Sequence, residues 1–438
     1  MGSITEAVQL EVQRRPFLFR NGLDLARRLG GPIVGAGSFY VVLSADRVRE
    51  VLGRPADFLS GPIYAPRLKL GPLILGMDVS ERYVDEKNIL AHALAPKGSF
   101  DTQVRRHAAD VLKNLNGRSS IDFVTIDLVT EVIEPVFVRS LCELFGIRPD
   151  DARSDFVEGR GEKVIAQWMR KVGGLIASSV PAPFGLDGLT DRLKDEMARF
   201  FNDPNSHHPG SLFDAVKKLP GPPSRCVGGM MLPAATLFKS ATLAIDKLLN
   251  RPRALGPAEV HAFTQLEGEH VNASWGLIQE ALRFQPPIPM LVRYCPRPTT
   301  LGSKSIPAAA TVLVSLFSAM FDPKKVEQPE KFSVERPDDT YLLFGAGHHA
   351  CIASQLARTG LSSLISVLFQ TLNMERPRQG IVYDGPAVAQ YNVRVKFRTG
   401  AIHAIGPHHP LPLQTSVHRR YGAGGPAAAT EKAATGPR

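Results

Sequence analysis

Phe344-Gly345-Ala346-Gly347-His348-His349-Ala350-Cys351 is the stretch of this 438-residue chain that says most about its fold. Gly345 and Gly347 permit backbone conformations that side chains would block, so they predict a tight loop that can approach a flat ligand closely. The apolar run after Cys351 predicts the first turns of a helix. Free amides at a helix start favour a negative sulfur, so a thiolate here is expected to be stabilised and to suit the axial position of a haem iron.

The spacing F-G-x-G-x-H-x-C in this stretch resembles the haem-binding loop of cytochromes P450. The resemblance implies that Cys351 is the proximal ligand of the iron of haem b and that Phe344, Gly345 and Gly347 shape the loop around it. It also implies that His349, two residues before the cysteine, faces a haem propionate.

Two other interpretations of Cys351 stay open from the residues alone. The cysteine could be an inert buried thiol after a glycine-rich turn, which is the usual role of a free cysteine. It could also join His348 and His349 in a zinc site. Their spacing fits no zinc pattern, and no second cysteine pair lies nearby.

Glu280-Ala281-Leu282-Arg283 places a carboxylate and a guanidinium three residues apart on one face of an expected helix. Taken alone, such a pair is usually a surface ion pair. Arg336 follows in a proline-flanked segment shortly before the cysteine loop, and this order resembles the E-x-x-R helix and meander arginine of cytochromes P450. The resemblance implies a buried, structural network of Glu280, Arg283 and Arg336, for which the bidentate geometry of arginine is well suited.

Two further arginines are candidates for haem propionates by the same resemblance. Arg293 matches in position the arginine that pairs with a propionate, although it could also be a solvated strand residue. Arg82 occupies the place of the histidine in the family's H-x-x-x-R helix. Glu86 stands where that arginine is usual and would repel a propionate, and Lys87 is a substitute for it.

The region aligned with oxygen activation departs from the family pattern. Leu232-Pro233-Ala234-Ala235-Thr236 matches the place of A/G-G-x-D/E-T, midway along a long helix that crosses the distal haem face. Thr236 is retained as the candidate catalytic residue, or it bonds back to a helix carbonyl. Ala235 replaces the proton-relaying acid, whose loss removes roughly two to four orders of magnitude from a step that needs it. Pro233 is expected to kink the helix.

Hydrophobic periodicity indicates a mainly α protein with minor β structure, in one large helical domain with the cytochrome P450 fold. We expect an N-terminal extension at 1–34, the haem domain at 35–412 and a disordered tail at 413–438. The segments read as strands and turns are 38–43 and 293–318, and the helical patterns cover 45–52, 123–145, 189–201, 227–249, 261–284 and 352–372.

Composition bounds the compartment and the partners. Four scattered cysteines predict no disulfide framework and favour a reduced, cytoplasmic setting, and the first residues predict no signal peptide or membrane anchor. The formal charge of +10 indicates either a basic docking face for an acidic electron-transfer partner or a generally solvated surface. No nucleic-acid motif matches, so nucleic acid is not expected as a partner.

The resemblance implies a haem-thiolate monooxygenase that hydroxylates or epoxidises a hydrophobic small molecule with O2 and external electrons. A ferredoxin or flavoprotein is the expected donor, because no G-x-G-x-x-G unit follows an expected strand. Since Ala235 lacks the acid, a peroxide-using or isomerase/dehydratase-type enzyme is an alternative. A non-catalytic haem-binding protein and a helical protein without haem are the other two.

Overall fold

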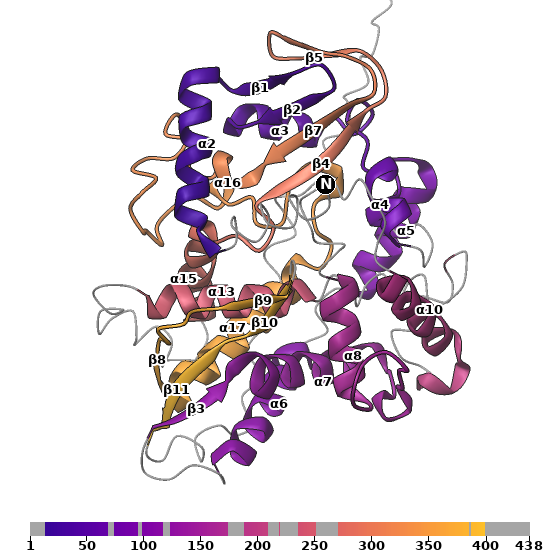
Figure 1. Ribbon diagram of the computed structural model, residues 1–438, viewed down its shortest axis with the longest axis vertical. Helices are drawn as coiled ribbons and strands as arrows, with labels where there is room; N and C mark the ends of the chain where they lie inside the picture. The colour runs from indigo at the N-terminus through magenta and orange to yellow at the C-terminus, as the bar shows by residue number, and fades with distance from the viewer. Residues whose placement is uncertain are drawn as a thin grey trace, which may run out of the picture.

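The computed structural model describes residues 14–68, 74–94, 99–116, 123–173, 188–208, 219, 235–250, 270–384 and 387–398. Figure 1 shows one group of strands with several helices at one end of the molecule, and a second group of strands beside the helices that fill the rest. The described residues are predominantly helical, with several small sheets. The expected fold class, mainly α with minor β, is confirmed.

The largest sheet joins the N-terminal part of the chain to residues near 300. Its strands are β1 (Ile33–Ala36), β2 (Phe39–Val42), β7 (Ala310–Ser315) and β4 (Met290–Cys295), in that order. β2 is parallel to β7, and the other neighbours are antiparallel. The inward side chains of β2, β4 and β7 are buried in one apolar cluster, so this sheet is anchored by its own core.

Helix α2 (Pro16–Gly30) packs against this end of the molecule (Figure 1). The Arg27 guanidinium donates to the Ser318 carbonyl at 2.9 Å and to the Ser318 hydroxyl at 3.1 Å. Together with β1, the helix accounts for much of the segment expected to be an N-terminal extension at 1–34. Because both elements contact the sheet region, we propose that the haem domain begins near residue 16.

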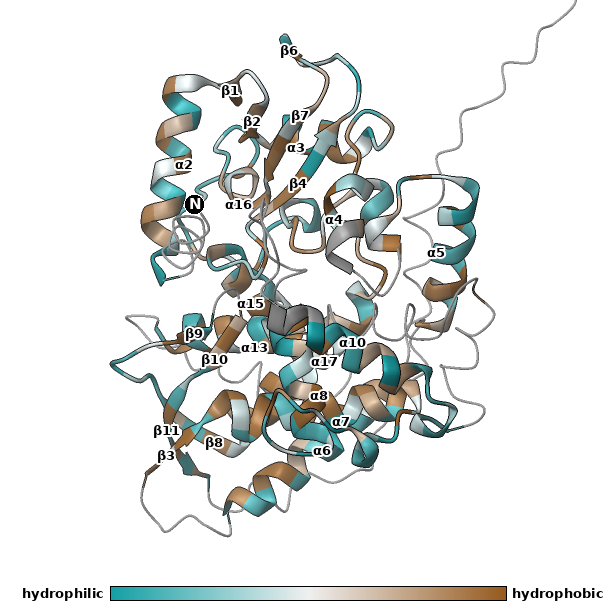
Figure 2. Ribbon diagram, turned by 45° about the vertical axis from the view of Figure 1, so that its right-hand side comes forward, coloured by the Kyte–Doolittle hydropathy of each residue, from teal (hydrophilic) through white to brown (hydrophobic). Residues whose placement is uncertain are grey.

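The helical part is built around α6 (Ser99–Asn116), α7 (Glu134–Phe145), α13 (Ala235–Leu249), α15 (His270–Phe284) and α17 (Ser354–Thr371). The buried apolar faces of these helices form the larger core cluster of the described residues. In Figure 2, β7 is mostly hydrophobic, whereas α2 carries both hydrophilic and hydrophobic residues along its length. None of the helices in the described part of the chain is long and apolar enough to cross a membrane.

Helix α17 approaches α6 closely at Gly360. A Cβ at this position would lie 2.8 Å from the nearest ring atom of Phe100 and 3.2 Å from Phe137. A larger residue at position 360 therefore requires these aromatic side chains to move. The close packing of α17 at this point therefore depends on glycine.

The other elements complete the frame around the site. Their bounds are α3 (Ala45–Gly53), α4 (Gly61–Leu68), η1 (Ile74–Gly76), α5 (Glu81–Ala93), β3 (Val124–Asp127), η2 (Val129–Ile133), η3 (Pro149–Asp151), α8 (Glu162–Trp168), η4 (Met169–Gly173), α10 (Gly188–Asn202), η5 (Pro204–Ser206), β5 (Thr299–Leu301), β6 (Lys304–Ile306), α16 (Leu316–Ala319), η7 (Asp338–Thr340), η8 (Gly347–His349), β8 (Leu372–Glu375), β9 (Val382–Asp384), β10 (Ala387–Gln390) and β11 (Asn392–Phe397).

Some expected helix boundaries differ from the structure. The segment 123–145 begins with strand β3, which pairs with β11 because Val124, Thr125 and Ile126 fit a pleated surface. The helix after Cys351 begins at Ser354, following a short turn. The described helices of the segments 227–249 and 261–284 begin at Ala235 and His270, and the residues before them lie outside the described ranges, as does the tail at 413–438.

Candidate functional site

The cysteine loop is a tight turn that rests on helix α3. Gly345 and Gly347 adopt φ angles of +69° and +70°, which side chains other than glycine rarely adopt. A Cβ at Gly347 would lie 2.2 Å from the carbonyl oxygen of Leu52, so the close contact with α3 needs glycine there. The Cys351 amide donates to the Phe344 carbonyl at 3.0 Å, which closes the loop.

An aromatic stack supports the loop from the helical side. The rings of Phe344 and Trp275 are stacked, with centroids 6.0 Å apart and planes inclined by 19°. Trp275 is buried and lies on α15, the helix that also carries Glu280 and Arg283. The stack therefore links the loop directly to the E-x-x-R helix.

The thiol of Cys351 is surrounded by protein but is reached by solvent. The residue is accessible to solvent, yet burial is the largest cause of the raised pKa of its thiol. A hydrogen bond from the Ala353 backbone and the charge of Lys87 lower this pKa. The expected stabilisation of the thiolate is thus present but, in the protein alone, is outweighed by desolvation.

Three basic side chains converge near this thiol from three elements. Arg293 of β4 is buried, and burial lowers the pKa of its guanidinium. Within the described ranges, no carboxylate lies within ion-pair distance of Arg293, which donates to the Val292 carbonyl at 2.8 Å. Arg293 and Lys87 both contribute to lowering the pKa of His349, after burial, to about 4. The Tyr64 side chain hydrogen-bonds to Arg293, and the charge of Asp78 favours the charged guanidinium from beyond ion-pair distance. Because burial outweighs these effects, the cluster fits an additional anionic ligand.

Helix α5 holds the loop through Lys87, which the sequence named as a substitute, and through Tyr83, which sequence reasoning did not single out. The Tyr83 hydroxyl donates to the His348 carbonyl at 2.5 Å, and the Lys87 ammonium donates to the same oxygen. The Tyr83 and His349 rings lie 5.0 Å apart, and the His349 Nε2 is 3.2 Å from the Ser60 hydroxyl. Tyr83 and Ser60 had no recognisable motif, because their role depends on contacts more than 250 residues away in sequence.

Glu280, Arg283 and Arg336 are brought together, as the sequence predicted. Glu280 and Arg283 are fully buried, and Arg283 donates from Nε and a terminal nitrogen to the two carboxylate oxygens, each at 2.8 Å. The Arg336 Nε lies 3.2 Å from Glu280 Oε1. The same carboxylate accepts from the Tyr341 hydroxyl at 3.1 Å and from the Ser333 amide at 2.9 Å. Its location, far from solvent, agrees with a structural role.

The two arginines also collect backbone carbonyls of the segment before the loop. Arg283 donates to the carbonyls of Met320, Pro329 and Lys331, and Arg336 donates to those of Glu327, Gln328 and Lys331. One buried carboxylate therefore organises a long irregular segment. This segment leads directly into the cysteine loop.

Arg82 lies apart from this cluster. Its side chain is 52% exposed, and its Nε pairs with the Glu86 carboxylate at 2.8 Å, while Glu86 itself is buried. The ion pair neutralises the carboxylate that was expected to repel a propionate. Lys87 instead reaches the loop, so the structure favours the alternative named from the sequence for this helix.

Thr236 lies in the first turn of the described helix α13, next to buried Ala235. Its carbonyl accepts a hydrogen bond from the Ser240 hydroxyl at 2.6 Å. Residues 232–234, and with them the kink expected at Pro233, lie outside the described ranges.

These residues satisfy the requirements of a flat, acidic cofactor whose metal takes a thiolate. The glycine loop permits close approach, Cys351 is accessible to solvent within the protein, and Arg293 and Lys87 offer positive charge. The zinc alternative receives no support. Within the described ranges, no three His, Cys, Asp or Glu side chains gather closely enough to hold a metal ion, and the His349 Nε2 faces Ser60.

Comparisons with known proteins agree with this geometry. A family model described as Cytochrome P450 matches residues 275–384, the range that holds the E-x-x-R helix, the meander and the cysteine loop. Cytochrome P450 144 of Mycobacterium tuberculosis is 25% identical over 349 residues, covering 74% of this chain and 76% of that protein. Cyclomarin C epoxidase CymV of Salinispora arenicola is 32% identical over 126 residues, covering 28% of this chain and 32% of CymV.

The overall fold has close structural counterparts. The cytochrome P450 enzyme CYP109B1 from Bacillus subtilis superposes with a TM-score of 0.65 at 20% identity, covering 87% of this chain and 99% of that structure. At this identity the likeness establishes the fold alone, and it confirms the fold expected from the sequence.

Proposed function

The chain belongs to the cytochrome P450 family, and from this premise we propose that it is a haem-thiolate monooxygenase acting on a hydrophobic small molecule. Members of this family bind haem iron through a cysteine thiolate. Cys351 is the residue of this chain that takes this role. The observation that carries the proposal is that the glycine loop holds the Cys351 thiol, which is surrounded by protein yet accessible to solvent, close to the ammonium of Lys87.

The residues around Cys351 prepare the sulfur for its role. The Ala353 backbone and the Lys87 ammonium both favour the thiolate over the thiol. The Phe344–Trp275 stack and the network of Glu280, Arg283 and Arg336 hold the loop in place. When bound, haem with a thiolate ligand supplies the oxidising chemistry, because the electron-rich sulfur favours O–O cleavage.

Positive charge beside the loop holds the acidic edge of the cofactor. Arg293 supplies the permanent charge, and Lys87 adds a second cation. His349 is neutral at pH 7 because its pKa is lowered to about 4, so it contributes a hydrogen bond rather than a charge. Arg82, which is paired with Glu86, has no part in this arrangement.

The substrate side is assigned to helix α13. Thr236 is the hydroxyl that positions a proton donor, and Ala235 supplies no acid. Hydroxylation or epoxidation with O2 therefore needs protons from water or from the substrate. Electrons come from a ferredoxin or a flavoprotein, for which the excess of 52 Lys and Arg over 42 Asp and Glu supplies a complementary charge.

The first experiment tests the sulfur ligand. The reduced protein should give the CO-difference spectrum of a thiolate-ligated haem, and Cys351→Ala should lose it. Cys142→Ala is the matched control, because Cys142 is buried on α7 away from the loop. An unchanged spectrum in Cys351→Ala, or an equal loss in Cys142→Ala, would refute the assignment of Cys351.

Peroxide use is the second candidate function, because Ala235 lacks the relay acid. The wild-type protein and Ala235→Asp are compared with O2 and a reductase, and then with hydrogen peroxide alone. Turnover restricted to peroxide in the wild type, with gain of O2-driven turnover in Ala235→Asp, supports the peroxide-using enzyme. Efficient O2-driven turnover in the wild type that Ala235→Asp leaves unchanged shows that the missing acid has no consequence.

A further inference from the structure

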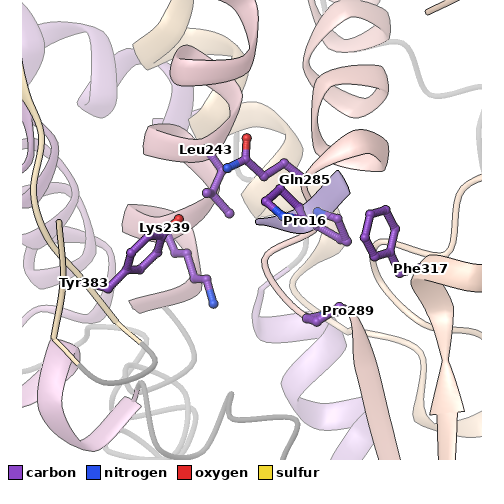
Figure 3. A pocket seen from close by; sticks show the side chains of 8 residues that line it. Pro16, Lys239, Leu243, Gln285, Pro289, Phe317 and Tyr383 are labelled. Carbon is purple, nitrogen blue, oxygen red and sulfur yellow. The ribbon is translucent and has the colours of Figure 1, made fainter. Parts of the chain in front are cut away.

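A hollow with one buried cation lies where helix α13 faces the segment between α15 and β4 (Figure 3). Its volume is about 20 Å3, and Lys239 of α13 is the one basic residue among those that line it. The rest of the lining is mostly apolar, with two polar groups. The lining residues used in the argument are Pro16, Leu243, Gln285, Pro289, Phe317 and Tyr383.

Lys239 has no counter-charge in the part of the chain that the structure describes. Lys239 is only 7% exposed, and burial alone lowers the pKa of its ammonium to about 8. Figure 3 shows the side chain extended, with its nitrogen end in the hollow. An isolated charge in an apolar surrounding costs several kcal/mol. A ligand that brings an anion into the hollow removes that cost.

Asp246, the other buried charged residue of the described helix α13, has partners that Lys239 lacks. Its carboxylate pairs with Arg376 at 2.8 Å and accepts a hydrogen bond from the Tyr391 hydroxyl at 2.9 Å. The buried charge of Asp246 is thus neutralised by an ion pair within the protein. Lys239 is directed into a space instead, beside a second polar group, because Gln285 lines the hollow and hydrogen-bonds to Tyr383.

The hollow borders the elements that build the candidate active site. Lys239 follows Thr236 by three residues, so both lie on the same side of α13. The segment from Gln285 to Pro289 joins α15, which carries Glu280, to β4, which carries Arg293. An anion bound to Lys239 is therefore held about one helical turn from Thr236 on the proposed catalytic helix.

We propose that Lys239, with Gln285 beside it, binds the carboxylate of the substrate, which is a hydrophobic monocarboxylic acid. The inference rests on the proposed function and names its substrate class. A volume of about 20 Å3 is far below that of pockets that enclose a whole ligand, so the hollow takes the carboxylate alone and the apolar chain extends from it. The mostly apolar lining disfavours a multiply charged, strongly hydrated anion, which fits a monocarboxylate better.

Calorimetric titration of the purified holoprotein tests this inference. Straight-chain acids from octanoate to hexadecanoate are compared with the alcohols of equal length, below micelle-forming concentrations. At least one acid should bind more tightly than its alcohol. Lys239→Met should weaken acid binding by about 10- to 150-fold, the loss expected for one charged hydrogen bond, and should leave alcohol binding within about threefold.

Lys247→Met is the matched control, because Lys247 lies on the same helix and packs over the Phe284 ring, outside the hollow. It should keep the preference for the acid. Lys239→Gln replaces Lys239→Met if the latter fails to fold. The inference is overturned if no acid binds better than its alcohol, or if a folded Lys239 variant keeps the preference.

Failure of this inference and failure of the proposed function are distinguishable. Calorimetry reports ligand binding without using the haem spectrum, whereas the CO-difference spectrum reports the thiolate without using a substrate. A protein with the thiolate spectrum and no preference for acids loses the inference alone. A protein that prefers acids through Lys239 but lacks the thiolate spectrum loses the proposed function alone.

Discussion

Replacing Glu280 with glutamine removes the one negative charge at the centre of a buried network. The carboxylate accepts two hydrogen bonds from Arg283 and one each from Arg336, Tyr341 and the Ser333 amide. In Glu280→Gln, the guanidinium groups of Arg283 and Arg336 lose their counter-charge. The amide NH2 group of the new side chain also faces N–H donors, with which it cannot form hydrogen bonds. Breaking a buried ion pair in this way costs about 3–5 kcal/mol, a large part of the roughly 5–15 kcal/mol that stabilises a typical domain.

The free energy of unfolding of Glu280→Gln is measured by urea denaturation, with the slope of the transition checked against the wild type. Glu162→Gln is the control, because Glu162 pairs with Arg139 at 2.8 Å while both side chains are 33% exposed. Such a pair contributes about 0–1 kcal/mol. A loss below about 1 kcal/mol in Glu280→Gln, or no more than in Glu162→Gln, would show that this network does not hold the fold together.

The network also predicts an effect on the loop. Arg283 and Arg336 bind the carbonyls of the segment that leads to Tyr341 and onward to Cys351. We therefore expect Glu280→Gln to release haem faster than the wild type, measured by transfer to apomyoglobin. Equal release rates would mean that the network stabilises the protein without positioning the loop.

Three further substitutions test the loop itself. Gly347→Ala should cost about 2 kcal/mol or more and reduce haem content, because φ is +70° and the new Cβ would meet the Leu52 carbonyl at 2.2 Å. Gly345→Ala, with φ of +69° and open space around it, should cost only about 1–2 kcal/mol, so an equal loss in both variants contradicts the steric argument. His349, whose pKa falls from 6.5 to about 4, stays neutral on folding, so the unfolded chain binds more protons between these values. The contribution of neutral His349 to the free energy of unfolding is fully present above pH 6.5. It is lost as pH falls toward 4, and the loss is at most about 3 kcal/mol. Between pH 7 and pH 4.5, the free energy of unfolding from urea titrations should fall less in His349→Gln than in the wild type. An identical fall in both proteins would show that His349 is not its cause.

The arrangement around Arg293 depended on elements that are distant in sequence. Lys87 and Tyr83 come from α5, and His349 comes from the cysteine loop. The sequence indicated Arg293 and His349 only through a family resemblance, and it favoured Arg82 on α5. The structure pairs Arg82 with Glu86 and turns Lys87 to the loop, because residues 82 and 86 are one helical turn apart and 87 lies on a different face.

Local patterns were sufficient for what is encoded over short distances. The glycine-framed loop before Cys351, the Glu280–Arg283 spacing and the helical periodicity predicted the fold class and the candidate iron ligand. They did so because turn geometry and helix faces depend on neighbouring residues. Only the tertiary structure decided that β2 pairs with β7, that Tyr341 and Ser333 complete the Glu280 network, and that Lys239 projects into a hollow without a counter-charge. These features arise where segments 53 to more than 250 residues apart exclude water together, and burial of that kind leaves no periodic signal in the sequence.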